Sequence, residues 1–468
     1  MLNLTLIMID DCRGFVRELK KQRKLKKVRV QVDRNWEIGC IARKVMEFQP
    51  DKRFAILFEK IKGFKFPVFI NGFASTEMYA IGLGTTVDGV QETWQSALQR
   101  PVEPELASTG ACKENILLGE SIDLNIFPHI VSTPKKESAP YITGGCVVMK
   151  DPETGIGNVG VYRCMFKGKD KLGIHMAPIS DGGIIYSKYE RLNRPMEVAI
   201  AIGPPPTVYS TAIARVPFGV DELAVAGGLM HSPLKIVKCE TVDLEVPANS
   251  EIVIEGEVQP KYRESEGPFG EFYGYMGEEI MSPVVYVTAI TYRNNPIYQS
   301  LLQQNTPNEG TLCKDMGMEV ILMNTFKSIG ILAVTDVHVR ERSSGECVVL
   351  AINNAHPEQV RLLAQACWAT YPISFKQVIV VDSDCNVRDY SDVEWRMSTC
   401  VQPERDIHVF NNCAASALDP SVQKDKRKQG SKLCIDATRK INYPEVALPP
   451  KSMLDKAEKR WKKYGLSE

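Results

Sequence analysis

The sequence predicts a three-part fold in which a central unit rich in β-strands is flanked by two α/β units. Its 468 residues exceed what one hydrophobic core usually holds, which favours two or three domains. Amphipathic helices alternate with short apolar strands towards both ends of the chain, whereas strand patterns dominate the middle. We therefore expect an N-terminal α/β domain at residues 1–115, a central β domain at 116–310 and a C-terminal α/β domain at 311–468.

The N-terminal unit is predicted from its helical spacing and its short apolar runs. Residues 11–22 place apolar side chains at helical spacing behind Asp10 or Asp11, either of which can cap the helix. A Pro-rich, polar segment at 101–112 marks the domain boundary. The other expected elements are helices at 37–48 and 87–98 and strands at 28–32, 54–58 and 67–70.

The middle of the chain carries strand patterns separated by turns. One helix is expected at 221–230, where Asp221 can serve as the cap. This order suits an antiparallel barrel or sandwich with a helical insertion, and such a barrel can enclose a small-molecule site. The expected strands lie at 144–149, 157–166, 197–202, 251–258 and 284–292.

The last third returns to alternating helices and strands. A charged segment after Leu448 is expected to form a peripheral helix. The expected elements before it are helices at 311–326 and 356–369 and strands at 329–339, 347–351 and 377–381.

The composition argues against several classes of function. Lys plus Arg and Asp plus Glu each number 57, so the formal net charge is zero and nothing global points to a nucleic-acid partner. No apolar run approaches the roughly 20 residues that a membrane-spanning helix needs. The first residues lack the basic lead and the small-residue cleavage site of a signal peptide. We therefore expect a cytoplasmic protein without a membrane span.

The 13 cysteines are scattered, odd in number and without a CxxC pair. This argues against a disulfide framework and against a zinc or iron–sulfur site. Most should be reduced, small and buried. Cys164 is expected to pack in the interior rather than to act as a nucleophile.

Two carboxylates bracket a rigid turn in residues 264–277, which read ESEGPFGEFYGYMG. Pro fixes φ and Gly frees the backbone, so the turn between Glu266 and Glu271 is not the interior of a helix. The surrounding aromatic residues would place these carboxylates in an apolar wall, which raises the pKa of an acid. The alternative is a Gly/Pro loop with two solvated glutamates.

An arginine lies within the expected strand at 157–166, which begins GNVGVYRCM. Strand alternation puts Arg163 on the face opposite Asn158 and Tyr162. A buried arginine needs an anionic partner, and phosphate or carboxylate fits its fork. The alternative is a surface arginine at a strand end. The Gly-rich segment 181–183 could also cradle a phosphate, but it is a weak motif.

Four segments together resemble the UbiD-type decarboxylases in order and spacing. They are GNVGVYRCM, DELAVAGGLM, SPLKIVKCETVDLEVPANSEIVIEGEV and EGPFGEFYGYMG. EIGCIARKVM, LFEKIKG and PVFINGF resemble the N-terminal domain of that family, and VDSDCNVRDYSDVEWRMST and GSKLCIDAT resemble its C-terminal domain. The resemblance covers nearly the whole chain. It implies that the central domain is a split β-barrel that binds flavin and that the C-terminal α/β domain mediates oligomers.

The resemblance implies reversible, non-oxidative decarboxylation of an aromatic, heteroaromatic or α,β-unsaturated carboxylic acid. The family uses prenylated FMN, because loss of CO2 from an sp2 carbon leaves a carbanion that ordinary side chains cannot stabilise. Its Glu–Arg–Glu triad falls on Arg163, Glu266 and Glu271. Arg163 would hold the substrate carboxylate or the electron-rich edge of the flavin and would pair with Glu266. Glu271 would donate the proton after CO2 leaves, so its pKa should rise from about 4.3.

The same resemblance places the cofactor phosphate near Asn158 and the backbone of Val161, Tyr162 and Arg163. In the family a divalent cation, usually Mn2+, bridges this phosphate, often with K+ nearby. Asn158 matches one family ligand, and Glu222 matches the glutamate that opens the helix of DELAVAGGLM. Both supply the oxygen donors that Mn2+ prefers. The alternative for Glu222 is a solvated acid in the first turn of a helix.

For two of the expected cofactor contacts, the sequence leaves open which residue makes the contact or whether it is made. The third metal ligand, often His in the family, falls near Ser180 and Asp181. Asp181 could replace the histidine, whereas a Ser180 counterpart would weaken the metal site. Lys432 is similar to a family lysine that reaches the cofactor phosphate, and the alternative is a surface lysine in a basic run.

Two other classes of function stay open. The chain could be a non-catalytic subunit of a multi-subunit aromatic carboxylase, although its intact triad argues against this. It could be an ordinary flavin reductase, although no nicotinamide-binding Gly fingerprint is present. The resemblance further implies a flavin prenyltransferase as cofactor supplier, CO2 as a product and a homodimer or homohexamer. The substrate, free acid or CoA thioester, is not readable from the residues.

Overall fold

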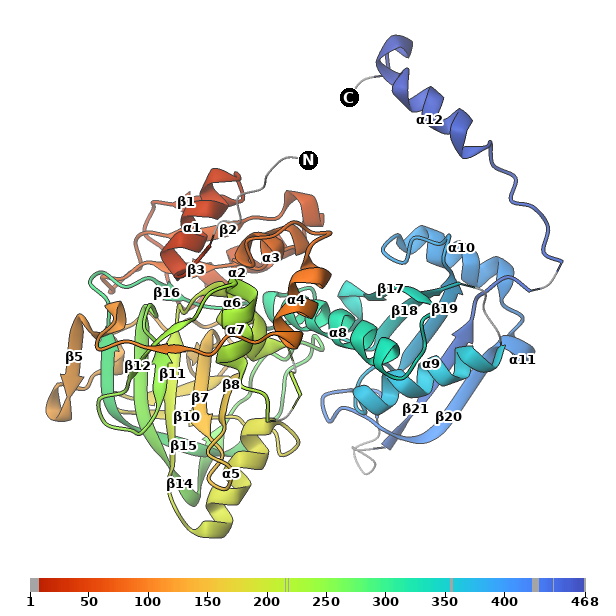
Figure 1. Ribbon diagram of the computed structural model, residues 1–468. Coiled ribbons are helices and arrows are strands. Elements are labelled where there is room, and N and C mark those ends of the chain that lie inside the picture. Colours follow the sequence, from red (N-terminus) through yellow and green to blue (C-terminus); the bar gives the residue numbers. More distant parts are fainter. Residues whose placement is uncertain are drawn as a thin grey trace.

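A computed structural model describes residues 8–214, 216–217, 219–353, 357–422, 429–440 and 442–466. The chain has the expected mixed α/β fold: an N-terminal α/β body packs on a strand-rich central body, and a second α/β body lies to one side of them (Figure 1). The domain bounds given above stay a prediction. In the described part of the chain, no helix has the length and apolarity needed to cross a bilayer.

The N-terminal body is a four-stranded sheet of order β1-β2-β3-β16 with helices packed against it. Asp11 caps the first helix by accepting the Gly14 N–H at 2.5 Å, as predicted. The strand expected at 28–32 lies earlier in the chain, because β1 pairs in register from Leu25 to Val28 with β2. The elements are α1 (Cys12–Lys21), β1 (Leu25–Val28), α2 (Glu37–Met46), β2 (Ala55–Phe58), β3 (Val68–Ile70), α3 (Thr76–Gly82), α4 (Val90–Gln99) and β16 (Tyr298–Gln299).

The central body is a nine-stranded antiparallel sheet with three helices and a small three-stranded sheet beside it. The large sheet contains β5 (Asn115–Leu118), β6 (Tyr141–Ile142), β7 (Gly145–Lys150), β8 (Gly157–Val161), β9 (Cys164–Gly168), β10 (Lys171–Ile174), β11 (Met196–Ile202), β14 (Ile252–Glu266) and β15 (Ile280–Tyr292). The other elements are β4 (Glu105–Leu106), α5 (Asp181–Leu192), α6 (Pro206–Ile213), α7 (Glu222–Met230), β12 (Lys235–Lys238) and β13 (Glu245–Pro247).

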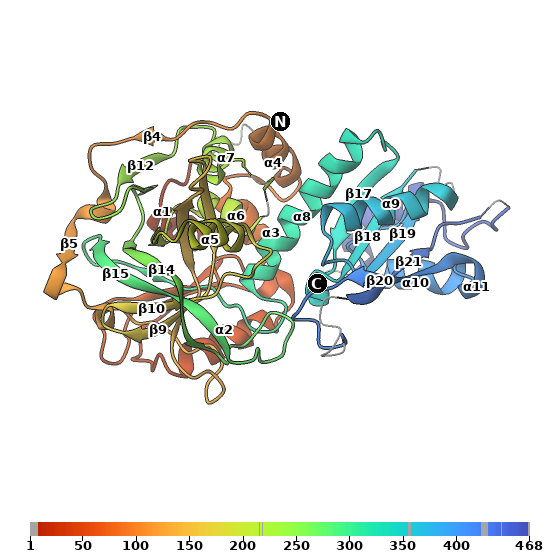
Figure 2. The same cartoon turned by 90° about the horizontal axis from the view of Figure 1, so that it is seen from below.

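A two-residue connection forces the large sheet to curl. Its order is β6-β9-β10-β15-β14-β11-β7-β8, so β8 and β9 lie near opposite edges. A flat sheet would separate these strands by about 30 Å, but Tyr162 and Arg163 alone join them and span about 10 Å. The sheet therefore curves into a split barrel (Figure 2). The prediction of one continuous strand at 157–166 was wrong, and Arg163 lies where the two edges meet.

The C-terminal body is a five-stranded sheet of order β17-β18-β19-β21-β20, with apolar clusters on both faces. Strands β18, β19 and β21 are parallel. His356, the first residue of the helix expected at 356–369, lies outside the described residues. The elements are α8 (Glu309–Ser328), β17 (Val334–Val339), β18 (Cys347–Ile352), α9 (Pro357–Thr370), β19 (Gln377–Asp382), α10 (Tyr390–Cys400), α11 (Pro403–Asp406), β20 (Ile407–Ala414), β21 (Gln429–Asp436) and α12 (Lys451–Lys459).

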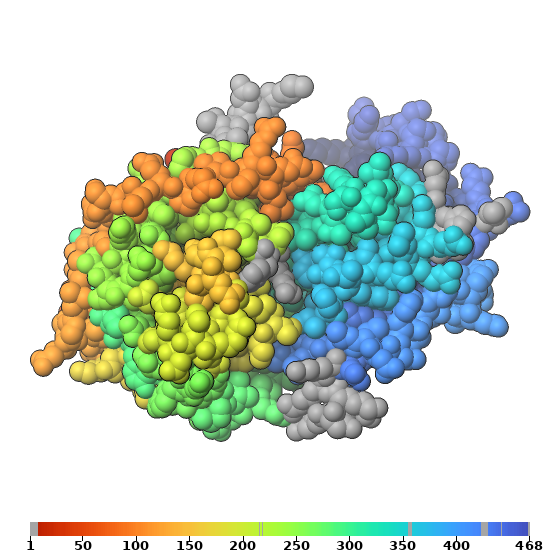
Figure 3. Space-filling model, turned by 60° about the horizontal axis from the view of Figure 1, so that its bottom comes forward, coloured from red at the N-terminus to blue at the C-terminus, as the bar shows by residue number. Residues whose placement is uncertain are grey.

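Helix α8 joins the C-terminal body to the rest of the molecule. Leu312 and Cys313 at its start belong to the main core, whereas Leu322 and Phe326 near its end belong to the C-terminal core. The C-terminal body and the rest of the molecule meet along one boundary in the space-filling view (Figure 3). The helix expected after Leu448 is α12, which stands apart from the remainder of the chain (Figure 1).

Candidate functional site

Arg163, Glu266 and Glu271 meet at the junction of β8 and β9. Nε and Nη2 of Arg163 donate to the two carboxylate oxygens of Glu266 at 2.9 and 2.8 Å, which makes a bidentate pair. The remaining Nη1 donates to Oε1 of Glu271. The structure thus brings the three predicted catalytic residues together. It also adds a direct contact between Arg163 and Glu271 that was not predicted.

The loop that carries Glu271 is held by its own backbone. Glu266 ends β14, and the chain leaves the sheet there, as expected for the Gly/Pro turn. The Glu271 N–H donates to the Tyr275 carbonyl at 2.9 Å, and the Glu271 carbonyl accepts the Asn305 N–H at 3.1 Å. Gly270 and Met276 form a β-bridge that closes the loop. The carboxylate of Glu271 is therefore presented from an ordered segment.

Burial dominates the electrostatics of this triad. Glu266 is fully buried, and the Arg163 and Glu271 side chains are about one-tenth exposed. Burial raises the pKa of Glu271, although the Arg163 cation opposes the rise, so the predicted direction is confirmed. Burial also disfavours the charge of Arg163, but Glu266 and Glu271 together raise its pKa overall. The alternatives of a surface arginine and of solvated glutamates were wrong.

Aromatic and imidazole rings surround the guanidinium. The Phe269 ring lies 4.9 Å from the guanidinium carbon of Arg163 and 4.6 Å from the Tyr141 ring. Burial and the nearby Glu266 raise the pKa of Tyr141, so it stays a neutral phenol. Burial and the nearby Arg163 lower the pKa of His175 to about 4, so this ring is neutral at physiological pH. The Tyr141 and His175 rings beside the triad are thus neutral.

A second cluster forms where α7 meets β8. Nδ2 of Asn158 donates to Oε1 of Glu222 at 3.0 Å, and the Val159 N–H donates to Oε2 at 2.9 Å. Glu222 opens α7 behind the Asp221 cap, as predicted. Glu222 is only 4% exposed, so the alternative of a solvated acid in the first turn of a helix was wrong. Burial raises its pKa to about 8, and the charge of Asp181 adds to the rise.

The Asn158 amide oxygen is the unsatisfied atom of this cluster. Oδ1 is buried and has no hydrogen-bond partner among the described residues. A buried acid with a raised pKa beside an unsatisfied amide oxygen is a favourable place for a cation. In the described part of the chain no group of three His, Cys, Asp or Glu residues suits a metal. A metal here would therefore need the Asn158 oxygen as a ligand.

The segment 181–183 is the first turn of α5. The Ser180 hydroxyl caps this helix by accepting the Gly183 N–H at 3.2 Å. The Gly182 N–H donates to the Tyr162 hydroxyl at 2.9 Å. The cap and Tyr162 thus take up the amides of Gly183 and Gly182, and a phosphate contact of this segment stays a prediction. Burial raises the pKa of Tyr162 to about 12.

Lys432 lies apart from the Asn158 cluster. It is on β21 in the C-terminal body, where Nζ donates to the carbonyls of Pro372 and Ser374 at 2.7 Å each. It is buried, so it is not the surface lysine of the alternative interpretation. Its part in cofactor binding stays a prediction. Cys164, in contrast, is confirmed as a buried member of the main core.

Sequence reasoning missed the residues that tie the Glu271 loop to the C-terminal body. Tyr273 donates a hydrogen bond to Oε1 of Glu346. The Ser344 hydroxyl donates to the Phe272 carbonyl at 3.3 Å. No spacing in the chain signals these contacts, because their partners lie about seventy residues apart.

Comparison with known proteins agrees with this architecture. Family models of 3-octaprenyl-4-hydroxybenzoate carboxy-lyase match at residues 16–98 (N-terminal domain), 105–305 (Rift-related domain) and 315–437 (C-terminal domain). An uncharacterized protein of Synechocystis is 30% identical over 98% of this chain and 97% of its own length.

Two solved structures are similar along nearly their whole length. The UbiD-class enzyme HmfF from Pelotomaculum thermopropionicum, in complex with FMN, is 33% identical, covers 96% of this chain and 99% of its own, and has a TM-score of 0.86. Vanillic acid decarboxylase of Sedimentibacter hydroxybenzoicus, in closed form, is 28% identical, covers 97% and 99%, and has a TM-score of 0.87. The chain therefore belongs to the UbiD family and is a carboxy-lyase.

Proposed function

We propose that this carboxy-lyase catalyses the reversible, non-oxidative decarboxylation of an aromatic, heteroaromatic or α,β-unsaturated carboxylic acid with prenylated FMN. The observation that carries the proposal is the buried Arg163, whose guanidinium holds Glu266 and Glu271 at the meeting of the barrel edges. Structures of HmfF hold FMN or prenylated FMN, and relatives act on vanillic acid and 3,4-dihydroxybenzoic acid. These relatives support an aromatic acid as the substrate class.

The residues of the second cluster fit the cation that would hold the cofactor phosphate. The unsatisfied Asn158 Oδ1 and the Glu222 carboxylate supply two oxygen ligands for Mn2+ or another divalent cation. For the third ligand, Asp181 is favoured over Ser180. The Ser180 hydroxyl is engaged with Ala177 and Gly183, whereas the Asp181 charge acts on Glu222. K+ would be a further ion beside this group.

The side chains of the triad have separate tasks in the proposed reaction. When bound, prenylated FMN supplies the electron sink that the carbanion needs. Glu266 takes two of the three donating nitrogens of Arg163, so it fixes the plane of the guanidinium. The third nitrogen, Nη1, faces Glu271 and can turn to a substrate carboxylate. Such a carboxylate competes with Glu271 for the same N–H.

This competition favours protonation of Glu271. Burial raises its pKa, and the contact with Arg163 is what opposes the rise. When a substrate carboxylate takes over Nη1, the opposing effect weakens and Glu271 holds its proton more tightly. After the bond to CO2 breaks, Glu271 delivers that proton to the carbon that lost CO2. In the carboxylation direction the same carboxylate removes the proton.

Release of CO2 is the direct test of the proposed activity. Protein loaded with prenylated FMN is offered a panel of aromatic and conjugated acids, and CO2 release and deuterium exchange at the carboxylated carbon are measured. Mass spectrometry of the released cofactor and its absorbance spectrum identify the flavin. Loaded protein that neither releases CO2 nor exchanges deuterium with any acid would favour the non-catalytic subunit. Plain FMN with nicotinamide oxidation would favour a reductase.

A further inference from the structure

A cavity of about 400 Å³ lies beside the loop that carries Glu271, and Glu271 is part of its wall. Its other walls come from α2, from the segment 132–136 and from residues 304–305. Arg163, which contacts the Glu271 carboxylate, is not among the described residues of this wall. The cavity therefore reaches Glu271 from a side that Arg163 does not occupy.

This cavity connects solvent with Glu271. Cys40, Lys136 and Asn305 are exposed parts of its wall, whereas Ser132 is buried. The Glu271 side chain keeps 12% of its surface exposed, so water can still reach the carboxyl group. One water molecule takes about 30 Å³ in the liquid, so the cavity has room for a connected chain of water molecules.

The wall of the cavity carries polar atoms that no protein group satisfies. Ser132 Oγ and Gln304 Oε1 are buried and have no hydrogen-bond partner in the described part of the chain. Buried polar atoms are rarely left without a partner, and ordered water is a common one. Because both residues line the cavity, water held inside it would satisfy these two oxygens.

The walls are held together by contacts between distant parts of the chain. Nη1 of Arg43 on α2 donates to the Asn305 carbonyl at 2.8 Å, and Nε2 of Gln304 donates to the Ser132 carbonyl at 2.9 Å. Gly39 lets α2 approach the same segment, because a Cβ atom there would lie 2.8 Å from the Ser132 carbonyl oxygen. The cavity is therefore a built feature of the fold.

The proposed reaction consumes the proton of Glu271 in every turnover. Decarboxylation replaces the bond from carbon to CO2 with a C–H bond, and the hydrogen comes as a proton from the Glu271 carboxyl group. Glu271 is left as a carboxylate, which must take up a proton from water before the next turnover. A substrate carboxylate on Nη1 of Arg163 occupies the other side of Glu271, so the cavity is the side on which water can approach.

We propose that this cavity is a proton-supply port, in which a chain of water molecules returns a proton from solvent to the Glu271 carboxylate after each turnover. The inference rests on the role proposed above for Glu271. The port separates the path of the proton from the side on which the substrate meets Arg163. The reacting groups can thus stay shielded from bulk water while the proton donor is restored.

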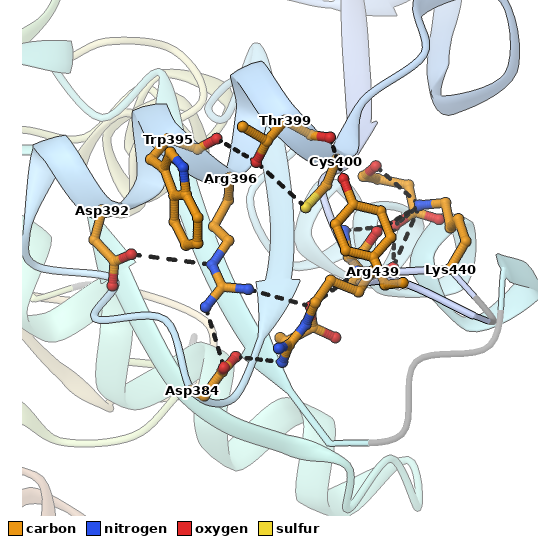
Figure 4. Close-up of polar contacts among 12 residues, drawn as sticks. Asp384, Asp392, Trp395, Arg396, Thr399, Cys400, Arg439 and Lys440 are labelled. Atoms are coloured by element: carbon orange, nitrogen blue, oxygen red, sulfur yellow. Dashed lines mark hydrogen bonds and ion pairs between the residues drawn. The ribbon is translucent and has the colours of Figure 1, made fainter. Parts of the chain in front are cut away.

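The thiol of Cys40 allows the port to be closed chemically. Cys40 is exposed, whereas Cys400, for example, is buried beside the Thr399 hydroxyl (Figure 4). N-Ethylmaleimide on Cys40 should lower steady-state CO2 release by the loaded enzyme by about tenfold or more. The first turnover should be unaffected, because Glu271 already carries its proton, so about one CO2 per site should appear in a burst. Cys40→Ser is the matched control, and the reagent should not slow its turnover.

A bulky side chain closes the mouth of the port without a reagent. Cys40→Trp should reproduce the burst and the slow steady state with little change in kcat/KM, because the steps up to loss of CO2 do not use the port. Lys44→Trp is the matched control, since Lys44 is exposed one turn further along α2 and does not line the cavity. Circular dichroism and flavin content check that both variants are folded. Equal kinetics for the two variants would overturn the port, and so would a fall in kcat/KM without a burst, which would indicate a substrate entrance.

Proton exchange tests the port without turnover. The loaded enzyme is saturated with phenylacetate as a non-reacting carboxylate and mixed with D2O, and the C=O band of protonated Glu271 is followed by infrared spectroscopy. Glu271→Gln identifies the band. Exchange should be slower in Cys40→Trp than in Lys44→Trp by about tenfold or more. Equal exchange rates would overturn the port even where CO2 is released normally. Wild-type protein that releases no CO2 from any acid would contradict the proposed function instead, and the exchange rates would still decide on the port.

Discussion

Tyr273 donates a hydrogen bond to Glu346, which ties the loop that carries Glu271 to the C-terminal body. The other carboxylate oxygen of Glu346 accepts the Lys376 N–H at 2.9 Å, next to β19. On the opposite side, Arg163 holds the same loop to the barrel. The loop is thus fixed by two bodies at once, and the position of Glu271 depends on how they meet. Vanillic acid decarboxylase, a relative, has been solved in open and closed forms.

Tyr273→Phe should lower turnover without removing the cofactor. A hydrogen bond to a charged group is worth about 1.5 kcal/mol or more, so a loop released at one end should cost roughly tenfold in turnover. Flavin content and thermal stability should change little, and the pH profile should shift, because Glu271 loses its fixed distance from Arg163. Tyr275→Phe is the matched control, since Tyr275 is exposed in the same loop. Identical pH profiles for the two variants would contradict the role.

Decarboxylation should fall as the pH rises through the pKa of Glu271. Burial raises that pKa, and a proton donor is active only in its protonated form. Because Glu271 can donate only while it is protonated, activity is retained at pH values below its pKa and lost at pH values above it. Glu271→Gln should abolish turnover while flavin stays bound. The measurement is turnover against pH with loaded enzyme, and a variant that keeps turnover would refute the proton donor.

The fold class could be predicted from local patterns and the triad from the resemblance to the UbiD family, but the geometry between them could not. The expected helices at 37–48, 221–230 and 311–326 are all present, and side chains cap the second and third of them. Helix α5 was missed because two glycines open it. The break at Arg163 results from closure of the barrel, which depends on strand pairing far along the chain. Local spacing carries no information about that pairing.

Arg163→Met should lower the free energy of unfolding by more than the lost packing of the arginine side chain alone would. It leaves Glu266 fully buried without its cation, and removal of one member of a buried pair costs about 3–5 kcal/mol. The double variant Arg163→Met, Glu266→Leu should regain most of this free energy of unfolding, because no unpaired charge remains. It should stay inactive. Urea unfolding and CO2 release together test this, and a double variant less stable than the single one would contradict it.

Asp181→Asn and Ser180→Ala should separate the two candidates for the third metal ligand. Loss of the Asp181 carboxylate should weaken Mn2+ binding at least tenfold, since an oxygen anion is replaced by a neutral amide. Ser180→Ala removes the helix cap and should cost about 1 kcal/mol of stability, but it should leave Mn2+ affinity nearly unchanged. Metal titration and thermal unfolding give the two readouts. The reverse pattern of affinities would assign the ligand to Ser180.

Binding of Mn2+ should release about one proton from the metal-free protein at pH 7. Burial raises the pKa of Glu222 to about 8, so at pH 7 its carboxyl is mostly protonated and the metal must displace that proton. The apparent affinity should therefore rise about tenfold per pH unit below this pKa and level off above it. Calorimetry in two buffers of different ionisation enthalpy counts the released protons. Glu222→Gln should bind Mn2+ weakly at every pH and release none. Proton release that persists in Glu222→Gln would place the titrating group elsewhere in the cluster.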